Sequence, residues 1–305
     1  MNSALLSVIV IVHDMPRQAA NTLFTLSTAY QLDVTSQDYE VVVVENRTDN
    51  MLGEAAVTSL GSNFRYLEFE NSTQSPAASL AYGIANTQTP NLAIMIDGAR
   101  CITPRVIKYG LAAFRVDPHA MVTVPGYHLG SDEQHLATEY GEEQDIALLD
   151  SVDWRRDGYL LFMISVLFKG RHQPGYLRAM LESNCLFCSR LDYDEIGGVD
   201  LRFDLPGGGM VNLDLYRRIG DLPQTRLFVM PGEGTFHQFH GGVTTKVDKD
   251  REALMTAFKD QYLELRGEPY RSVEKRPTLI GAVTGWALPT LRESAAAEIA
   301  ESSVS

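Results

Sequence analysis

The hydrophobic pattern of the first hundred residues consists of short apolar runs separated by amphipathic segments. The runs are rich in β-branched residues and end at polar pairs or turn signals, which is typical of strands that are covered on both faces. They extend over Leu5 to Val12, Tyr39 to Val44, Phe64 to Phe69 and Leu92 to Ile96. We therefore expect these runs to form buried strands.

The segments between the runs have helical periodicity. Pro16 suits the first turn of a helix, with Asp14 as its cap. Apolar residues then recur at helical spacing at Ala19, Leu23, Leu26 and Tyr30. Further helices are predicted from Leu52 to Leu60 and from Ser75-Pro76 to Ile84. Strands that alternate with helices in this way predict an α/β fold with a parallel sheet and right-handed crossovers.

One carboxylate stands out because of its position in this pattern. Asp97 follows the run that ends at Ile96. A charge at the carboxyl end of a strand lies where open α/β sheets bind their ligands. Asp97-Gly98 is also a common turn pair, so a capping role in the next turn is the alternative interpretation.

The periodicity is less regular in the second half of the chain. From Gly126 to Arg178 no clear period is present, and an acidic tract from Glu139 to Asp145 suits a long insertion over a cleft. The remaining elements that we predict are a helix from Thr103-Pro104, strands over Ala120 to Val124, Ser183 to Ser189 and Leu227 to Met230, and helices over Val211 to Ile219 and Lys249 to Arg266. Beyond Pro269 the tail is rich in Ala, Glu and Ser, and we expect partial disorder there.

The composition excludes some classes of function. The chain is 45% hydrophobic and 21% charged, as in ordinary globular proteins, and its net charge of −13 argues against a nucleic-acid surface. No secretory signal is evident at the N-terminus. The most apolar window, Gly158 to Phe168, is shorter than the about 20 residues of a transmembrane helix, so no transmembrane segment is predicted and peripheral membrane contact stays open.

The cysteines indicate a cellular compartment rather than a disulfide framework or a zinc site. The chain has three, which do not make a disulfide framework. In a strand, Cys185 and Cys188 would point to opposite faces, and no second pair completes a zinc site. We interpret them as buried thiols of a protein in a reducing compartment, the cytoplasm.

Several sequence motifs follow one another in a specific order. SVIVIVHD and VVVVENRTD are strands that end in polar residues, and SLAYGIANTQTPNLAIMIDGA is a helix and a strand that lead into Asp97. IGGVDLRF, the glycines Gly207 to Gly209, and LDLYRR follow later in the chain. In this order they resemble the family 2 glycosyltransferases of the GT-A fold, from about Ser7 to Arg266.

This resemblance implies a domain division and an overall architecture. We expect a GT-A-like, Rossmann-type mixed sheet flanked by helices, in a domain over residues 1–268. Residues 1–100 would be the nucleotide-binding half and residues 101–268 the acceptor half, with an insertion over 126–180. Residues 269–305 would be a C-terminal extension that is partly disordered.

The resemblance also implies a donor site for a nucleoside diphosphate sugar. The residues expected at this site are His13, Glu45, Asn46, Asp97, Gly98 and Lys246. Asp97 would bind Mg²⁺ or Mn²⁺ together with the diphosphate, and His237 or His240 would add a nitrogen ligand. The alternative is that both histidines are turn or core residues beside Gly241.

Some positions depart from the family pattern. Ala99 stands where the family has the second Asp of its Asp-x-Asp element, and Leu80 stands where the donor side of the family has an Arg. Val211-Asn212 stands where the family has a Glu-Asp pair. Asparagine cannot accept a proton. Asp214 is about 200° round the helix from Asn212 and is no direct substitute.

We therefore predict that Glu182 is the catalytic base, on an acceptor side that also includes Asn212 and Asp214. The alternative is a surface glutamate at a strand start. A retaining route in which the leaving phosphate takes the proton would need no protein base.

The function that the resemblance implies is that of a hexosyltransferase, as in polysaccharide biosynthesis. The acceptor would be a carbohydrate, a lipid-linked glycan or a small molecule, and the protein could act as a homo-oligomer. The rival is a transferase-like domain that binds a nucleotide sugar or a protein partner without turnover. A nucleotidyltransferase is disfavoured because the N-terminal region has no glycine-rich loop followed by Arg and Lys.

Overall fold

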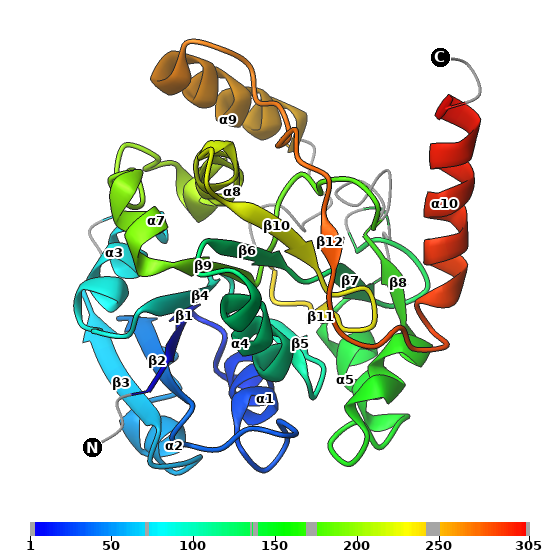
Figure 1. Ribbon diagram of the computed structural model, residues 1–305. Helices are drawn as coiled ribbons and strands as arrows, with labels where there is room; N and C mark the ends of the chain where they lie inside the picture. The colour runs from blue at the N-terminus through cyan, green and yellow to red at the C-terminus, as the bar shows by residue number, and fades with distance from the viewer. Residues whose placement is uncertain are drawn as a thin grey trace.

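The computed structural model describes residues 4–70, 73–134, 136, 140–168, 176–241 and 251–302. Its main sheet consists of β1 (Leu6–Val12), β2 (Tyr39–Asn46), β3 (Phe64–Phe69), β4 (Asn91–Met95), β6 (Ala120–Thr123), β9 (Leu186–Ser189), β10 (Arg226–Val229) and β12 (Thr278–Leu279). The order across the sheet is β12-β10-β6-β9-β4-β1-β2-β3 (Figure 1). β9 runs antiparallel to both β4 and β6, whereas the other neighbours are parallel. The predicted mixed α/β sheet is confirmed.

Helices cover both faces of this sheet. On one face pack α1 (Pro16–Leu26), α2 (Glu54–Thr58) and α4 (Val106–Val116), and on the other α3 (Ala77–Ala85), α7 (Arg190–Glu195), α8 (Val211–Asp221) and α9 (Arg251–Arg266). Successive side chains of β1 and β2 alternate between the two core clusters, as the pleat of a strand requires. This double coverage explains why the strands are nearly continuous apolar runs.

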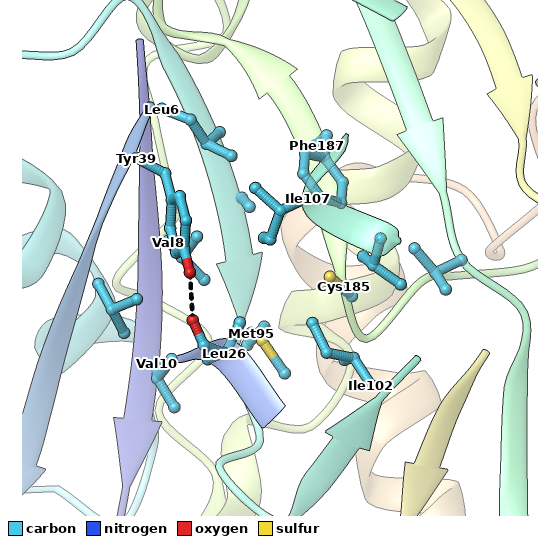
Figure 2. Close-up of a cluster of buried hydrophobic side chains, with 14 of the residues drawn as sticks. Leu6, Val8, Val10, Leu26, Tyr39, Met95, Ile102, Ile107, Cys185 and Phe187 are labelled. Carbon is cyan, nitrogen blue, oxygen red and sulfur yellow. Dashed lines mark hydrogen bonds between the residues drawn. The ribbon is translucent and has the colours of Figure 1, made fainter. Parts of the chain in front are cut away.

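The core on the α1 and α4 face also fixes the first helix. Figure 2 shows Val8 of β1 in the cluster that includes Ile107 and Phe187. In the same view the buried Tyr39 hydroxyl donates a hydrogen bond of 2.6 Å to the carbonyl oxygen of Leu26, at the end of α1. A buried polar atom is thereby satisfied by the last turn of a helix, which places α1 over the strands.

A second, smaller sheet lies beside the main one. It consists of β5 (Arg100–Ile102), β11 (Thr235–His237), β7 (Gly126–Leu129) and β8 (Ser165–Leu167), in the order β5-β11-β7-β8. Between β7 and β8 the chain forms α5 (Glu142–Asp150) and a 3₁₀ helix, η1 (Gly158–Ile164). An aromatic cluster that includes Trp154, Phe162 and Phe236 packs this layer. The segment expected to be a long irregular insertion is thus largely a second structural layer.

Some predicted element boundaries differ from the structure for local reasons. Asp14 does not cap α1: the N-cap is Met15, and Asp14 has a left-handed φ of 53°. α2 begins at Glu54 rather than at Leu52, because Gly53 before it has a φ of 83° and breaks the helical path. β9 begins at Leu186 rather than at Ser183.

The C-terminal segment contributes to the fold. β12 pairs in parallel with β10, and α10 (Leu288–Ser302) packs through Leu291 on a cluster that contains Tyr176 and Met180. Regular structure therefore extends through much of the predicted extension, and the division at residue 268 stays a prediction. None of the helices in the described part of the chain combines the length and apolarity that a bilayer crossing needs.

Candidate functional site

A cavity of about 480 Å³ opens at the carboxyl ends of β1, β2 and β4. This edge of an α/β sheet is the usual place for a ligand, because the loops there diverge and leave main-chain groups accessible. Among the described residues, the polar side chains that line it are His13, Asp14, Asn46, Thr73, Gln74, Ser75, Asp97, Arg100, His128, Glu182, Asn184, Asn212, His237, His240 and Arg251. The cavity thus combines carboxylates, imidazoles and guanidinium groups.

Main-chain pairing assembles the charged part of this cavity. After β4 the chain turns at Gly98, where an added Cβ would lie 2.6 Å from the carbonyl oxygen of Ile11. β5 then starts at Arg100 and runs antiparallel to β11, in a register that pairs Arg100 with His237. Asp97 and His237 come from distant parts of the sequence, and this register brings them together. We call Asp97, Arg100, His237 and His240 the Asp97 cluster.

The ligand atoms of the Asp97 cluster converge. Nε2 of His237 lies 3.3 Å from Oδ2 of Asp97 and 3.2 Å from Nε2 of His240. Nε2 of His240 lies 3.7 Å from Oδ1 of Asp97. One ligand atom from each of the three side chains lies within 4.8 Å of the other two, which is the arrangement of a group that can hold a metal ion.

A buried glutamine determines which nitrogen of His237 faces Asp97. The Nε2 amide group of Gln134 donates to the carbonyl oxygens of Leu129 and His237, so its Oε1 is left to accept from Nδ1 of His237, at 2.6 Å. With the proton on Nδ1, a neutral His237 directs the lone pair of Nε2 at the Asp97 carboxylate. Two lone pairs that face each other repel unless a proton or a cation lies between them, so this donor set fits a cation.

The protonation states agree with that interpretation. Burial, followed by the charge of Arg100, lowers the pKa of His237 to about 4, although Asp97 opposes this shift. Burial alone would raise the pKa of Asp97, but its neighbours His237, His240 and Arg100 hold it well below its usual range. Near neutral pH, Asp97 is ionised and His237 neutral, the states in which both side chains bind metal.

Arg100 is a candidate site residue that the sequence pattern did not indicate. Its side chain is 7% exposed and donates through Nε to Oδ2 of Asp97 at 3.2 Å. Its Nη1 is buried and has no hydrogen-bond partner among the described residues. A buried guanidinium with an unused donor is costly, and a ligand anion in the cavity would satisfy it. The signal available in the sequence was a cation directly after the Asp97 turn.

The segment that carries His240 is held by α1 and by the acidic helix α5. Asp145 accepts a hydrogen bond from the amide of Phe239 at 3.0 Å and pairs with Arg17, also at 3.0 Å. Gln18 donates to the carbonyl oxygen of Phe239 at 2.6 Å. Both main-chain groups of the residue before His240 are therefore fixed, which positions that imidazole beside Asp97.

The other part of the cavity is less charged. The carboxylate of Glu182, which is 8% exposed, accepts a hydrogen bond of 3.0 Å from the side chain of Asn212, and Asn212 also donates to Asn184. Asn212 lies in the first turn of α8. We call Glu182, Asn184, Asn212 and the glycines Gly207 to Gly209 the Glu182 wall. Glu182 is a buried cavity residue and not an exposed strand-start glutamate.

The glycines of this wall allow a tight approach. Gly208 has a φ of 80°, and an added Cβ would lie 2.7 Å from the ring of Pro76 and 2.8 Å from Val211. The run therefore brings the start of α3 against the start of α8. No other residue type fits that path without strain.

Of the other residues predicted for the sugar-donor site, some line the cavity and one supports a loop beside it. His13 and Asn46 line the cavity, and Ser79 donates to Oδ1 of Asn46. Glu45 is 1% exposed and accepts from the amides of Leu52 and Gly53 and from the Tyr66 hydroxyl. Glu45 thus holds the loop before α2 instead of facing the cavity.

The last two predicted site residues are Asp214 and Lys246. Asp214 is fully buried on α8, with its two carboxylate oxygens bound by Arg218 and Arg266. It ties α8 to α9, and its geometry gives no support to the expected place on the acceptor side. Lys246 lies outside the described residues.

The family departures Ala99 and Leu80 occupy core positions. Both are fully buried, one in each of the two core clusters. A carboxylate at position 99 would enter apolar surroundings, because the amide of Ala99 donates to Oδ1 of Asp97 and the main chain is fixed there. In this chain the position next along, Arg100, faces the cavity instead.

Comparison with known proteins gives a fold and no family assignment. No protein-family model matches the sequence, and no curated protein sequence matches it. Among solved structures, S. aureus TarS 1-349 in complex with UDP-GlcNAc is similar, with a TM-score of 0.52 and 13% identity, over 85% of this chain and 66% of that one. The complex of the same fragment with UDP has a TM-score of 0.51 and 12% identity, over 85% of this chain and 65% of that one.

The likeness extends over most of this chain but only part of the other protein. The longer TarS structure has a TM-score of 0.50 and 12% identity, and this chain covers 39% of it. The chain therefore spans about two thirds of the TarS 1-349 fragment and well under half of the longer TarS. At this identity the likeness shows the fold, which is the GT-A glycosyltransferase fold.

Proposed function

We propose that this chain is a glycosyltransferase that moves a sugar from a nucleoside diphosphate sugar to an acceptor hydroxyl. The observation that carries this proposal is the Asp97 cluster at the carboxyl edge of a GT-A sheet, in one cavity with the buried Glu182 carboxylate. A diphosphate leaving group needs cations and an inverting transfer needs a base, and the cavity offers both.

The donor half of the reaction would use the Asp97 cluster. Asp97, His237 and His240 would hold Mg²⁺ or Mn²⁺, which supplies charge to stabilise the diphosphate as it leaves. Arg100 would donate its unused Nη1 to a phosphate oxygen, a charge-assisted hydrogen bond that strengthens as the leaving group gains charge. His13 and Asn46 would contact the nucleotide at the ends of β1 and β2, with Glu45 and Gly98 shaping the loops beneath it.

The acceptor half would use the Glu182 wall. Glu182 would accept the proton of the acceptor hydroxyl as that oxygen attacks the anomeric carbon, and the bond to the diphosphate would break on the far side of the sugar. Asn212 would hold the carboxylate in place through its hydrogen bond of 3.0 Å. This route inverts the anomeric configuration.

The solved TarS complexes guide the choice of donor. They contain UDP-GlcNAc and UDP, so a UDP-hexose is the first donor to test. The protein would act as a hexosyltransferase on a glycan, a lipid-linked glycan or a small metabolite. The three cysteines of the chain are buried and unpaired, which suits the predicted cytoplasmic location.

The test is a calorimetric titration of UDP and of GDP, with and without Mn²⁺, into the wild type and the Asp97→Asn variant. We expect metal-dependent binding of one nucleotide and its loss in the variant. A matched control is Asp33→Asn, which changes an exposed carboxylate paired with Arg105 and Lys108. Donor hydrolysis or transfer should follow the same pattern.

The rival function is a binding domain without turnover. Nucleotide binding with no consumption of any sugar donor, in the presence of a panel of acceptors, would favour that rival. No binding of either nucleotide would contradict the transferase and would leave, of the rival, only the binding of a protein partner.

A further inference from the structure

A second cavity adjoins the Glu182 wall. It has a volume of about 420 Å³ and lies between the start of α8, the outer part of α9 and the residues that follow α9. Its apolar lining includes Met210, Leu213, Met255, Phe258 and Leu263. The volume lies within the range of cavities that hold small ligands, about 300 to 1,000 Å³. We call this cavity the apolar annex.

The annex and the main cavity are continuous in their lining. Gly209, Leu213 and Met255 border both. Leu213 directly follows Asn212, which holds the Glu182 carboxylate. A molecule that presents a hydroxyl to Glu182 therefore has the annex beside it.

The chemistry of the annex selects an apolar occupant. Phe258 and Leu213 are 2% and 5% exposed, so the inner lining is tightly packed hydrocarbon. The Tyr270 hydroxyl already donates to the carbonyl oxygen of Leu181. Among the described lining residues, the charged side chains are Lys259 and Asp260, and both are exposed. Polar groups of a ligand would lose their hydrogen bonds to water there and find no new partners. Burial of hydrocarbon would be favourable.

We propose that the apolar annex binds a hydrocarbon portion of the acceptor, an alkyl or prenyl chain attached next to the hydroxyl that receives the sugar. The inference rests on the proposed function, because it takes Glu182 as the point of reaction. Leu263 on α9 is 46% exposed and stands at the edge of the annex, where the chain would enter. The methionines allow chains of different shape, since their side chains adapt.

The test measures binding of a chain-length series, methyl, butyl, hexyl and octyl β-glucoside, each below its micelle concentration, by calorimetry. A buried methylene improves affinity by about fourfold, so we expect the affinity of the wild type to rise by about that factor per methylene until the annex is full. Leu263→Glu places a charge at the entrance and should flatten this dependence. Leu191→Glu is the matched control, because Leu191 is an exposed leucine (72%) on α7 and outside the annex lining.

Two results of the binding series would overturn the proposal. One is an affinity of the wild type that does not change with chain length. The other is an equal rise in the wild type, Leu263→Glu and Leu191→Glu, which would indicate nonspecific adsorption. Light scattering gives a further check. A wild-type dimer that dissociates in Leu263→Glu would assign the annex to contact with a second copy of the chain and contradict the proposal.

The outcome is separable from that of the proposed function. Chain-length-dependent binding that Leu263→Glu abolishes, in a protein that consumes no sugar donor, would support the annex and reject the transferase. Sugar transfer by a protein whose ligand affinity does not depend on chain length would support the transferase and reject the annex. Where transfer occurs, two acceptors with the same hydrocarbon chain are compared, one linked to a lipid and one soluble in water. The one that receives the sugar distinguishes a membrane source of the acceptor from a soluble source.

Discussion

The Asp97 cluster and the Glu182 wall line the same cavity but are built in different ways. The Asp97 cluster depends on strand register: β5 pairs with β11, and its side chains are then held by a network of buried hydrogen bonds. The Glu182 wall depends on a glycine run and the first turn of a helix, and it borders an apolar annex. One part is suited to a highly charged ligand and the other to a mostly neutral one.

This contrast has a physical consequence for function. Charges in the Asp97 cluster are preorganised, so they can stabilise a developing diphosphate without reorganisation. The Glu182 wall has one carboxylate, two side-chain amides and a run of glycines, and it borders an apolar annex, so we expect its specificity to come from shape and from exclusion of water. We expect substitutions in the first to change nucleotide and metal binding, and substitutions in the second to change turnover and acceptor choice.

The largest expected effect is on turnover, from Glu182→Gln. The amide keeps the shape but cannot accept a proton, so kcat should fall by about 10²- to 10⁴-fold, the usual contribution of a general base. Nucleotide affinity, measured by calorimetry, should stay within a factor of about two, because the proposed nucleotide site is the Asp97 cluster. A parallel loss of UDP binding would mean that the two parts of the cavity are not separable.

A second substitution tests the core position of Ala99. Ala99→Asp restores the family's second carboxylate in sequence but places it among apolar side chains. Burial that raises a carboxyl pKa by about 3 units destabilises the protein at neutral pH by about 4 kcal/mol. Urea unfolding measures this, with Ala257→Asp, on an exposed turn of α9, as the control. Unchanged stability together with tighter metal binding would show that position 99 reaches the cavity.

A third prediction concerns the pH dependence of stability in metal-free protein. His237 has a pKa near 6.5 in an unfolded chain and about 4 when folded, because burial disfavours its charged form. The unfolded state therefore binds the proton first as the pH falls. The free energy of unfolding should decrease by about 3 kcal/mol from above pH 6.5 to below pH 4.

The measurement is urea unfolding at several pH values in the presence of a chelator. His237→Gln should remove this part of the slope, while the exposed His13→Gln should leave it in place. If the wild type and His237→Gln decline in parallel, the imidazole is not held neutral in the folded state.

The smallest expected effect comes from the glutamine behind His237. Gln134→Met removes the acceptor of the Nδ1 proton, so His237 no longer keeps Nε2 ready for a metal. Loss of such a partner typically weakens metal binding by about 10- to 100-fold. Mn²⁺ titration of folded protein tests this, with Gln224→Met, which contacts Asp192 and Glu195, as the control. Equal Mn²⁺ affinities in the two variants would count against a metal at this place.

The first half of the fold was predictable because local and global signals agree there. The runs that became β1, β2, β3 and β4 are apolar, short and punctuated by turn residues. β1, β2 and β4 also lie in the interior of a sheet that is covered on both faces, so burial demands the same residues that strand propensity favours, whereas β3 is the edge strand. The second layer, β7 and β8 with α5 and η1, has no such agreement, because its core is aromatic and is assembled from several short segments.

The candidate site was predictable only in part, for a related reason. Asp97, His237, His240, Glu182 and Asn212 all line the cavity, and the sequence indicated them through strand ends and family motifs. Arg100 was missed because its importance depends on an unsatisfied Nη1 in three dimensions. Glu45 and Asp214 show the converse, since a carboxylate in a motif can be used entirely by neighbouring donors.

The amino-acid sequence alone determined the strand and helix pattern of the first half, the place of Asp97 at a strand end, and the two histidines near the last strands. These features follow from short-range periodicity and turn chemistry, which act within a few residues. The tertiary structure decided that His237 meets Asp97, that Ala99 enters the core while Arg100 faces the cavity, and that an apolar annex borders Glu182. Such contacts join residues far apart in the chain, and strand register and packing establish them only when the whole domain folds.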